Sequence, residues 1–191
     1  MDEGNRTRML RWVEADDRRF LRVLDSALAG GARTAGSHLA CQIGCTECCV
    51  GAFPITQLDA RRLRRGLSSL RETDPARASA VLARAALRLA EHDTEGPCPA
   101  LDPETGACDL YTARPVTCRT FGLPVRIGDD DLPPCRLCFT RATSAEIAAA
   151  RVTIDPEGDE QALVQALSEC GIADESTTVA EALLEVRQHT S

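Results

Sequence analysis

Apolar residues recur at helical spacing near the start of the chain. Between Thr7 and Ala29 they fall on one face of a 3.6-residue period, and the pair Gly30-Gly31 that follows is a typical helix terminator. The sequence therefore predicts an amphipathic helix over 7–29. The apolar positions on its face are Leu10, Val13, Phe20, Leu24, Ala27 and Leu28.

Capping residues place further helices. Thr56 precedes a periodic stretch that runs to Arg71, and Asp74-Pro75 precedes another that runs to Glu91, which together predict a helical hairpin. Thr143 and Thr178 each stand three residues before a glutamate, the pattern of a capping box, and a further helix is expected between Gly158 and Glu169. Residues 143–191 are therefore predicted to form C-terminal helices.

Two stretches of the chain favour irregular loops. Residues 32–56 are short on helical periodicity, residues 98–138 are rich in proline, and together the two stretches contain nine cysteines. Asp102 to Gly106 has the composition of a turn between two short extended pieces, which predicts a small β-hairpin. The predicted fold is mainly α: a single domain over 1–191, in which amphipathic helices surround a cysteine-rich, loop-built metal site.

Composition narrows the function classes. The net charge is −7 and the isoelectric point is near 5.0, so the basic surface that nucleic-acid binding needs is missing. All 22 basic residues are arginine, which excludes lysine Schiff-base chemistry. No run of 18 apolar residues is present and the N-terminus is polar, so we expect a cytoplasmic protein without a membrane partner. The arginine run at 61–65 is predicted to be a solvated helix face or a contact for an acidic partner.

Ten cysteines in a chain expected in the cytoplasm indicate metal binding more than disulfides. Short gaps let one loop direct several sulfurs at one ion, and clustered thiolates repel one another unless a cation neutralises them. The first block is Cys41-x3-Cys45-x2-Cys48-Cys49, the second is more widely spaced, and the third is a two-residue-gap pair. The predicted ligands are Cys41, Cys45, Cys48, Cys49, Cys98, Cys108, Cys118, Cys135 and Cys138.

Other residues near these blocks have two interpretations each. Tyr111, Arg114 and Arg119 flank Cys118 and could support the coordinated sulfur through hydrogen bonds. In the alternative interpretation, the two arginines form surface ion pairs with nearby aspartates and Tyr111 only packs. His38 is either an imidazole ligand or an exposed loop residue, and Cys170 is expected to be a small buried hydrophobe. Cys135 and Cys138 alternatively form a thiol redox pair.

The combined blocks resemble the YkgJ-family cysteine cluster proteins, which are described as zinc- or iron-chelating. The resemblance covers about residues 41–138 and includes Cys98-Pro99-Ala100-Leu101 and Cys108-x2-Tyr111-x2-Arg114-Pro115-x2-Cys118-Arg119. It implies chelation. Some relatives resemble flagellin lysine methylases that use an iron–sulfur cluster with S-adenosylmethionine, which implies an iron–sulfur-dependent methyltransferase as the enzyme alternative.

Soft thiolates suit both zinc and iron–sulfur clusters. The wide gaps from Cys98 to Cys118 favour a cluster, because zinc ribbons usually supply their ligands in two tight pairs. The sequence does not decide whether the protein is an enzyme. An enzyme predicts an open coordination position beside a pocket with titratable groups, whereas a structural site predicts four protein ligands.

Overall fold

The computed structural model describes residues 2–172 and 174–185, which form two compact units. Unit 1 comprises Met1–Cys41 and Arg119–Ala173, and unit 2 comprises Gln42–Cys118 and Asp174–Ser191. Each unit is thus assembled from two stretches of chain. The architecture is mainly α, as predicted, and includes a small sheet. The single domain over 1–191 stays a prediction.

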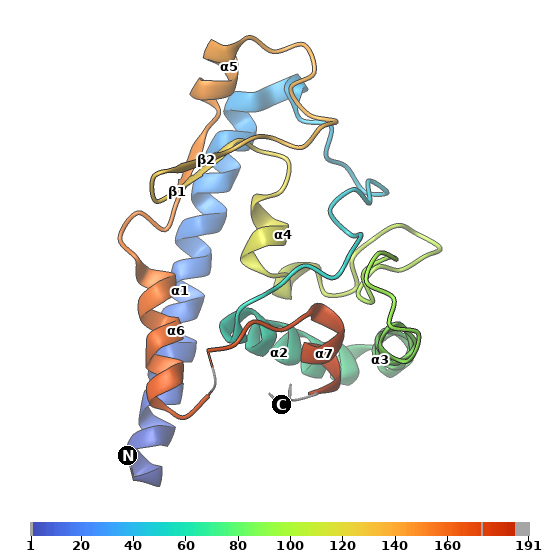
Figure 1. Cartoon of the computed structure of the whole chain (residues 1–191), viewed down its shortest axis with the longest axis vertical. Coiled ribbons are helices and arrows are strands. Elements are labelled where there is room, and N and C mark those ends of the chain that lie inside the picture. The colour runs from blue at the N-terminus through green and yellow to red at the C-terminus, as the bar shows by residue number, and fades with distance from the viewer. Residues whose placement is uncertain (1, 173, 186–191) are drawn as a thin grey trace. The chain divides into compact units, whose positions relative to one another are not determined.

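The long first helix organises unit 1. Helix α1 spans Glu3–Ala35 and begins where the Asp2 side chain accepts a hydrogen bond from the Asn5 amide. Its buried positions include Val13, Phe20, Leu24 and Leu28, as predicted, whereas Ala27 of the predicted apolar face is exposed. Helices α5 (Ser144–Ala149) and α6 (Asp159–Glu169) pack against it, and Figure 1 shows α6 alongside α1.

The predicted end of this helix at Gly30-Gly31 is wrong. The helix continues to Ala35 and ends at Gly36, which adopts a positive φ of 51° and donates its amide to the Ala32 carbonyl. Gly31 is a packing residue, because an added Cβ would meet the Val152 side chain and lie 3.1 Å from the Ala150 carbonyl oxygen. A glycine can therefore be selected for close approach instead of for termination.

A three-stranded sheet in unit 1 is absent from the sequence prediction. Its strands are β1 (Val125–Ile127), β2 (Asp130–Leu132) and β3 (Val152–Ile154), in the order β2-β1-β3. Strand β1 pairs antiparallel with β2 and parallel with β3. Three-residue strands are too short to show a period of two, so the C-terminal part of the chain is less uniformly helical than expected.

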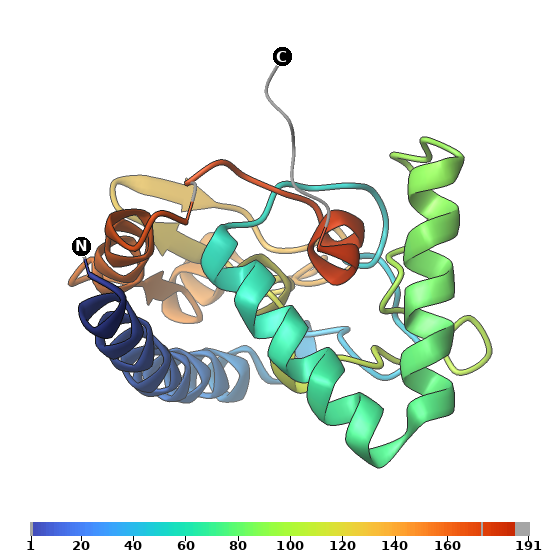
Figure 2. The same ribbon diagram turned by 90° about the horizontal axis from the view of Figure 1, so that it is seen from below.

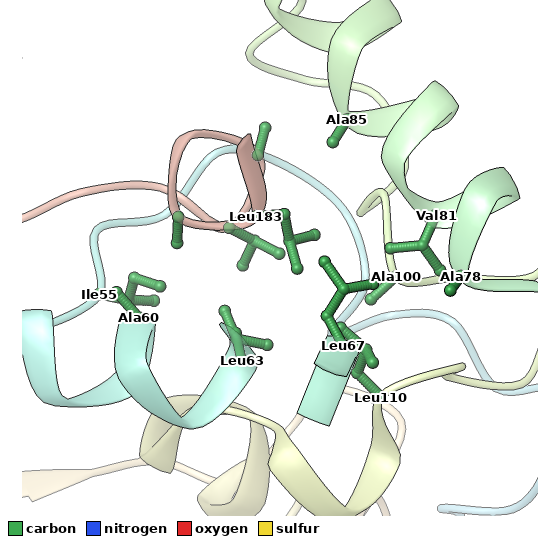
Figure 3. Close-up of a cluster of buried hydrophobic side chains, with 13 residues drawn as sticks. Ile55, Ala60, Leu63, Leu67, Ala78, Val81, Ala85, Ala100, Leu110 and Leu183 are labelled. Carbon is green, nitrogen blue, oxygen red and sulfur yellow. The ribbon is translucent and has the colours of Figure 1, made fainter. Parts of the chain in front are cut away.

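The helical hairpin of unit 2 is confirmed. Helices α2 (Gln57–Thr73) and α3 (Pro75–Ala90) begin at Thr56 and Asp74, whose side chains accept the predicted capping hydrogen bonds. Helix α7 (Val179–Leu184), which opens with a capping box, packs against both (Figure 2). Figure 3 shows the apolar core that the three helices share, with Leu63, Leu67, Val81 and Leu183 among its buried side chains.

The arginine run at 61–65 is not a solvated face. Arg62 is only 2% exposed and its Nη1 lies 2.6 Å from Asp59 Oδ1, while Arg64 Nε donates to the Ala182 carbonyl at 2.9 Å. Arg61 and Arg65 are half-buried. The run therefore helps to fasten α7 to α2.

Smaller elements link these helices. They are η1 (Gly36–His38), η2 (Tyr111–Ala113) and α4 (Val116–Thr120), and α4 contains the point where the chain passes from unit 2 back to unit 1. Cys170 follows α6 and is 3% exposed, which confirms its interpretation as a buried residue. None of the helices in the described ranges is both long enough and apolar enough to cross a membrane.

Two adjacent glycines of α1 provide a matched test of this packing. We expect Gly31→Ala to lower the free energy of unfolding, because overpacking a filled site costs about 1–3 kcal/mol. Gly30→Ala is the control: the nearest atom to its added Cβ is the flexible Arg33 Nη2 at 3.8 Å. That variant should gain about 0.5–1 kcal/mol from helix propensity. Urea unfolding of both variants measures the difference, and equal stabilities would contradict the packing role of Gly31.

Candidate metal centre

All ten cysteines lie in the described part of the chain, and none forms a disulfide. The nine predicted ligands divide between the two units. Unit 1 contains three of them, Cys41, Cys135 and Cys138. Unit 2 contains six, which are Cys45, Cys48, Cys49, Cys98, Cys108 and Cys118.

Backbone hydrogen bonds bring the separate cysteine segments of unit 2 together. The Cys98 amide donates to the Cys49 carbonyl at 2.7 Å, and Val50 pairs antiparallel with Pro97. Leu101 pairs antiparallel with Cys108 around the turn that starts at Asp102, which confirms the predicted hairpin. Cys98 is therefore held between the first cysteine block and Cys108.

A buried ion pair in α2 fixes the segment that carries Cys118. Asp59 Oδ1 accepts a hydrogen bond from the Val116 amide at 3.0 Å, at the start of α4, and also contacts Arg62 Nη1 at 2.6 Å. Asp59 and Arg62 are 3% and 2% exposed. The helical hairpin thus fixes the position of the segment that carries Cys118.

Burial keeps most of these thiols protonated. It raises the pKa of Cys98 to about 11 and also raises the pKa values of Cys108 and Cys118. Charges on Cys98, Cys48 and Cys108 raise the pKa of Cys118 further, and those on Cys48, Cys98 and Cys108 act on Cys49 in the same way. We call these five mutually interacting residues the thiol group of unit 2: Cys48, Cys49, Cys98, Cys108 and Cys118.

Cys48 is the exception. The Cys48 and Cys49 Sγ atoms lie 3.9 Å apart and share a hydrogen bond, which lowers the pKa of Cys48 to about 6 despite partial burial. The same hydrogen bond raises the pKa of Cys49. At neutral pH the pair therefore holds one negative charge, placed beside the remaining thiols.

Arg114 contributes positive charge to this group. Its guanidinium lies over the Tyr111 ring, 3.8 Å from the ring centroid. Its charge helps to lower the pKa of Cys48 and partly offsets the effect of burial, which raises the pKa of Cys108. Tyr111 is 61% exposed. Arg119 belongs to unit 1, where its Nη1 donates to both Asp25 oxygens at 2.8 and 2.9 Å. Hydrogen bonds from Tyr111, Arg114 or Arg119 to a coordinated sulfur stay predictions.

Unit 1 holds a second close pair of sulfurs. Cys41 Sγ and Cys138 Sγ lie 3.9 Å apart, and the Ala40 amide donates to Cys138 Sγ at 3.4 Å. The His38 ring stacks on Phe139, and its Nε2 lies 3.6 Å from Glu146 Oε1. A ligand role for His38 stays a prediction.

The donor atoms suit a soft metal. Two sulfurs bound to one tetrahedral zinc at about 2.3 Å stand about 3.8 Å apart, close to the 3.9 Å of each sulfur pair. Within residues 2–172 and 174–185, however, no group of three or more Cys, His, Asp or Glu side chains is already arranged to hold an ion. The convergence of all nine cysteines therefore stays a prediction.

Comparison with family models identifies this cysteine pattern. Residues 40–138, just over half of the chain, match the model of the CxxCxxCC family, whose description is "Putative zinc- or iron-chelating domain". The chain belongs to this family. Among curated proteins and among solved structures, no match to the chain was found. The CxxCxxCC match supports metal binding as the function and agrees with the resemblance drawn from the sequence.

The buried Asp59–Arg62 pair can be tested against an exposed pair of the same spacing. Asp59→Ala leaves a buried arginine without its partner, so we expect a loss of about 3–5 kcal/mol in the free energy of unfolding. Asp16→Ala removes the partner of Arg19, which is 59% exposed, and should cost at most about 0.5 kcal/mol. Urea unfolding measures both, and similar losses would refute the special position of Asp59.

The raised thiol pKa values predict a pH dependence for metal binding. Metal binds the thiolate, so Cys98, Cys108 and Cys118 must each release a proton on ligation near pH 7, whereas Cys48 is already ionised. The apparent affinity for a Zn²⁺ probe should therefore rise about tenfold per pH unit for each protonated ligand, between about pH 6 and 8. Competition with a chelator across this range measures the slope. A slope of zero would show that these thiols are not ligands.

Proposed function

We propose that the thiols of unit 2 bind an iron–sulfur cluster, and that this group stabilises the loops of unit 2. The supporting observation is that separate chain segments bring five mutually interacting thiols together. An iron–sulfur cluster supplies several positive iron centres to thiolates, which offsets the repulsion that burial makes severe.

The distribution of ligands favours a cluster over a single zinc ion. Cys48 and Cys49 come from one loop, Cys98 and Cys108 from the two sides of a hairpin, and Cys118 from α4. A zinc ribbon usually draws on two tight pairs, whereas cluster ligands are often spread along the chain. Cys45 completes a set of six proposed ligand positions, of which a cluster takes four.

The residues of this chain prepare the site in complementary ways. Cys48 offers a thiolate at neutral pH, and Arg114 stabilises its charge. Asp59 and Arg62 fix the segment that carries Cys118. The proposed location is the cytoplasm, since clustered cysteines suit metal binding in a reducing compartment.

A cavity of about 180 Å³ in unit 2 bears on the enzyme alternative. Cys98 lines it together with Arg88, His92, Asp93 and Glu181, so a pocket with titratable groups does lie beside a proposed ligand. This favours keeping an iron–sulfur-dependent methyltransferase as a second candidate. The volume falls below the roughly 300–1,000 Å³ of most ligand pockets, so the cavity admits only a small ligand and metal binding remains the leading function.

Anaerobic purification followed by iron, sulfide and zinc analysis tests the proposal. We expect iron and acid-labile sulfide in matching amounts, with broad visible absorption. Cys98→Ser, Cys108→Ser and Cys118→Ser should each lose most of the bound iron, whereas Cys170→Ser, a buried cysteine of unit 1, should retain it.

Two results would contradict the proposal at different levels. Stoichiometric zinc without sulfide would reject the cluster and keep metal binding. Metal binding by these thiols would be rejected if the anaerobically purified protein contained no metal and also took up neither zinc nor iron supplied with sulfide.

A further inference from the structure

The sulfur pair of unit 1 differs in setting from the thiol group of unit 2. Cys41 and Cys138 are separated by 97 residues in sequence, yet their Sγ atoms lie 3.9 Å apart. Both residues belong to unit 1. The Phe139 amide donates to the His38 carbonyl at 2.8 Å, and the two rings stack at a centroid distance of 5.7 Å. The segments that carry the two sulfurs are therefore fastened to each other beside the pair, at His38 and Phe139.

Gly122 leaves room for these sulfurs. Its φ is +103°, and a Cβ added there would lie 2.6 Å from Cys41 Sγ and 4.0 Å from Cys138 Sγ. Any larger residue would have to displace Cys41. The backbone at residue 122 thus forms one wall of the space in which the two sulfurs meet.

The two thiols differ in access. Cys41 is exposed, whereas Cys138 is 5% exposed and receives the Ala40 amide hydrogen bond at 3.4 Å. An exposed sulfur reacts first with a dissolved reagent, and a buried neighbour is placed to resolve the product.

We propose that Cys41 and Cys138 form a thiol–disulfide exchange site whose substrate is a low-molecular-weight disulfide of the glutathione class. The Cys41 thiolate, formed by proton loss to solvent, attacks one sulfur of that disulfide and releases one small thiolate. Cys138 then loses its proton and attacks Cys41 Sγ, forming the protein disulfide and releasing the second small thiolate. The protein loses two electrons and two protons, and one small disulfide becomes two small thiols.

Little movement is needed for this reaction. A disulfide has a bond of about 2.05 Å, so the two sulfurs must approach each other by about 2 Å. The redox alternative drawn from the sequence paired Cys138 with Cys135. The sulfur that the structure places beside Cys138 is that of Cys41.

The proposed bond has a topological effect. Cys41 is the last residue of unit 1 before the chain enters unit 2, and Cys138 follows the return at Arg119. A bond between them encloses residues 42–118 of unit 2 in one covalent loop. Transient disulfides of this kind in the cytoplasm are usually catalytic or redox-sensing.

Peptide mapping of the full-length, anaerobically purified protein tests the proposal. The protein is treated with glutathione disulfide, or with reduced glutathione as a control, alkylated and cleaved after arginine. Arg136 separates Cys135 from Cys138, so the peptide 137–141 contains only Cys138, and the peptide 34–61 contains Cys41. We expect these peptides to be cross-linked after oxidation, with loss of two hydrogen atoms, and separate after reduction.

Variants assign the bond and separate it from metal binding. Cys41→Ser and Cys138→Ser should each abolish the cross-link, and the iron content of each variant is measured beside that of Cys98→Ser. Cys170→Ser, the other cysteine that is buried in unit 1, should keep both.

Three outcomes would overturn the proposal. The first is a 137–141 peptide that remains uncrosslinked in oxidised wild-type protein. The second is a cross-link from the 137–141 peptide to the peptide that contains Cys135. A cross-link to peptide 34–61 that fragment masses assign to Cys45, Cys48 or Cys49 counts equally against the proposal. The third is a loss of iron from Cys41→Ser or Cys138→Ser comparable to that of Cys98→Ser, which would make the pair metal ligands. Absence of metal from wild-type protein leaves the mapping unaffected and bears only on the proposed function.

Discussion

Buried thiols within electrostatic reach of one another cannot all ionise unless positive charge joins them. In unit 2, burial and neighbouring thiolates raise the pKa values of most of the thiol group, and only Cys48 has a lowered pKa, through the Cys49 hydrogen bond. A bound cation lowers the pKa values of neighbouring thiols and favours their thiolate forms. Thiolate sites contribute about 10–16 kcal/mol when they bind zinc, an amount comparable to the stability of a whole domain. The stability of the loops therefore depends on the ionisation and metal binding of the thiols.

The helices of unit 2 support the loops in a way that does not depend on metal. The apolar core shared by α2, α3 and α7 forms without any thiol at its centre and supplies a rigid base (Figure 3). Asp59 extends this base to the loops, because one of its oxygens accepts both the Arg62 guanidinium and the Val116 amide. A buried carboxylate with two donors fixes a loop more firmly than an exposed ion pair does, since neither partner can exchange for water.

Local signals allowed the helices of the hairpin to be predicted, because Thr56 and Asp74 cap them within four residues of sequence. The features that were not predicted from the sequence depend on long-range packing. Gly31 is a contact for Val152, and strand β1 exists because Val125 pairs with residues 132 and 152. The cysteine spacing indicated metal chemistry and its family, but the division of the nine cysteines between units depends on tertiary contacts such as Cys41 with Cys138. No periodicity encodes such contacts.

The interleaving of the two units also bears on biosynthesis. A chain made from its N-terminus releases all six cysteines of unit 2 before residues 179–184, which complete the core of that unit. Unit 1 is likewise incomplete until β3 and α6 have been synthesised. Domains generally fold as they leave the ribosome, but neither unit has all of its parts until late in translation. The nascent thiols of unit 2 therefore lack their final covering until residues 179–184 have been synthesised, so the order of emergence determines when they are first sheltered.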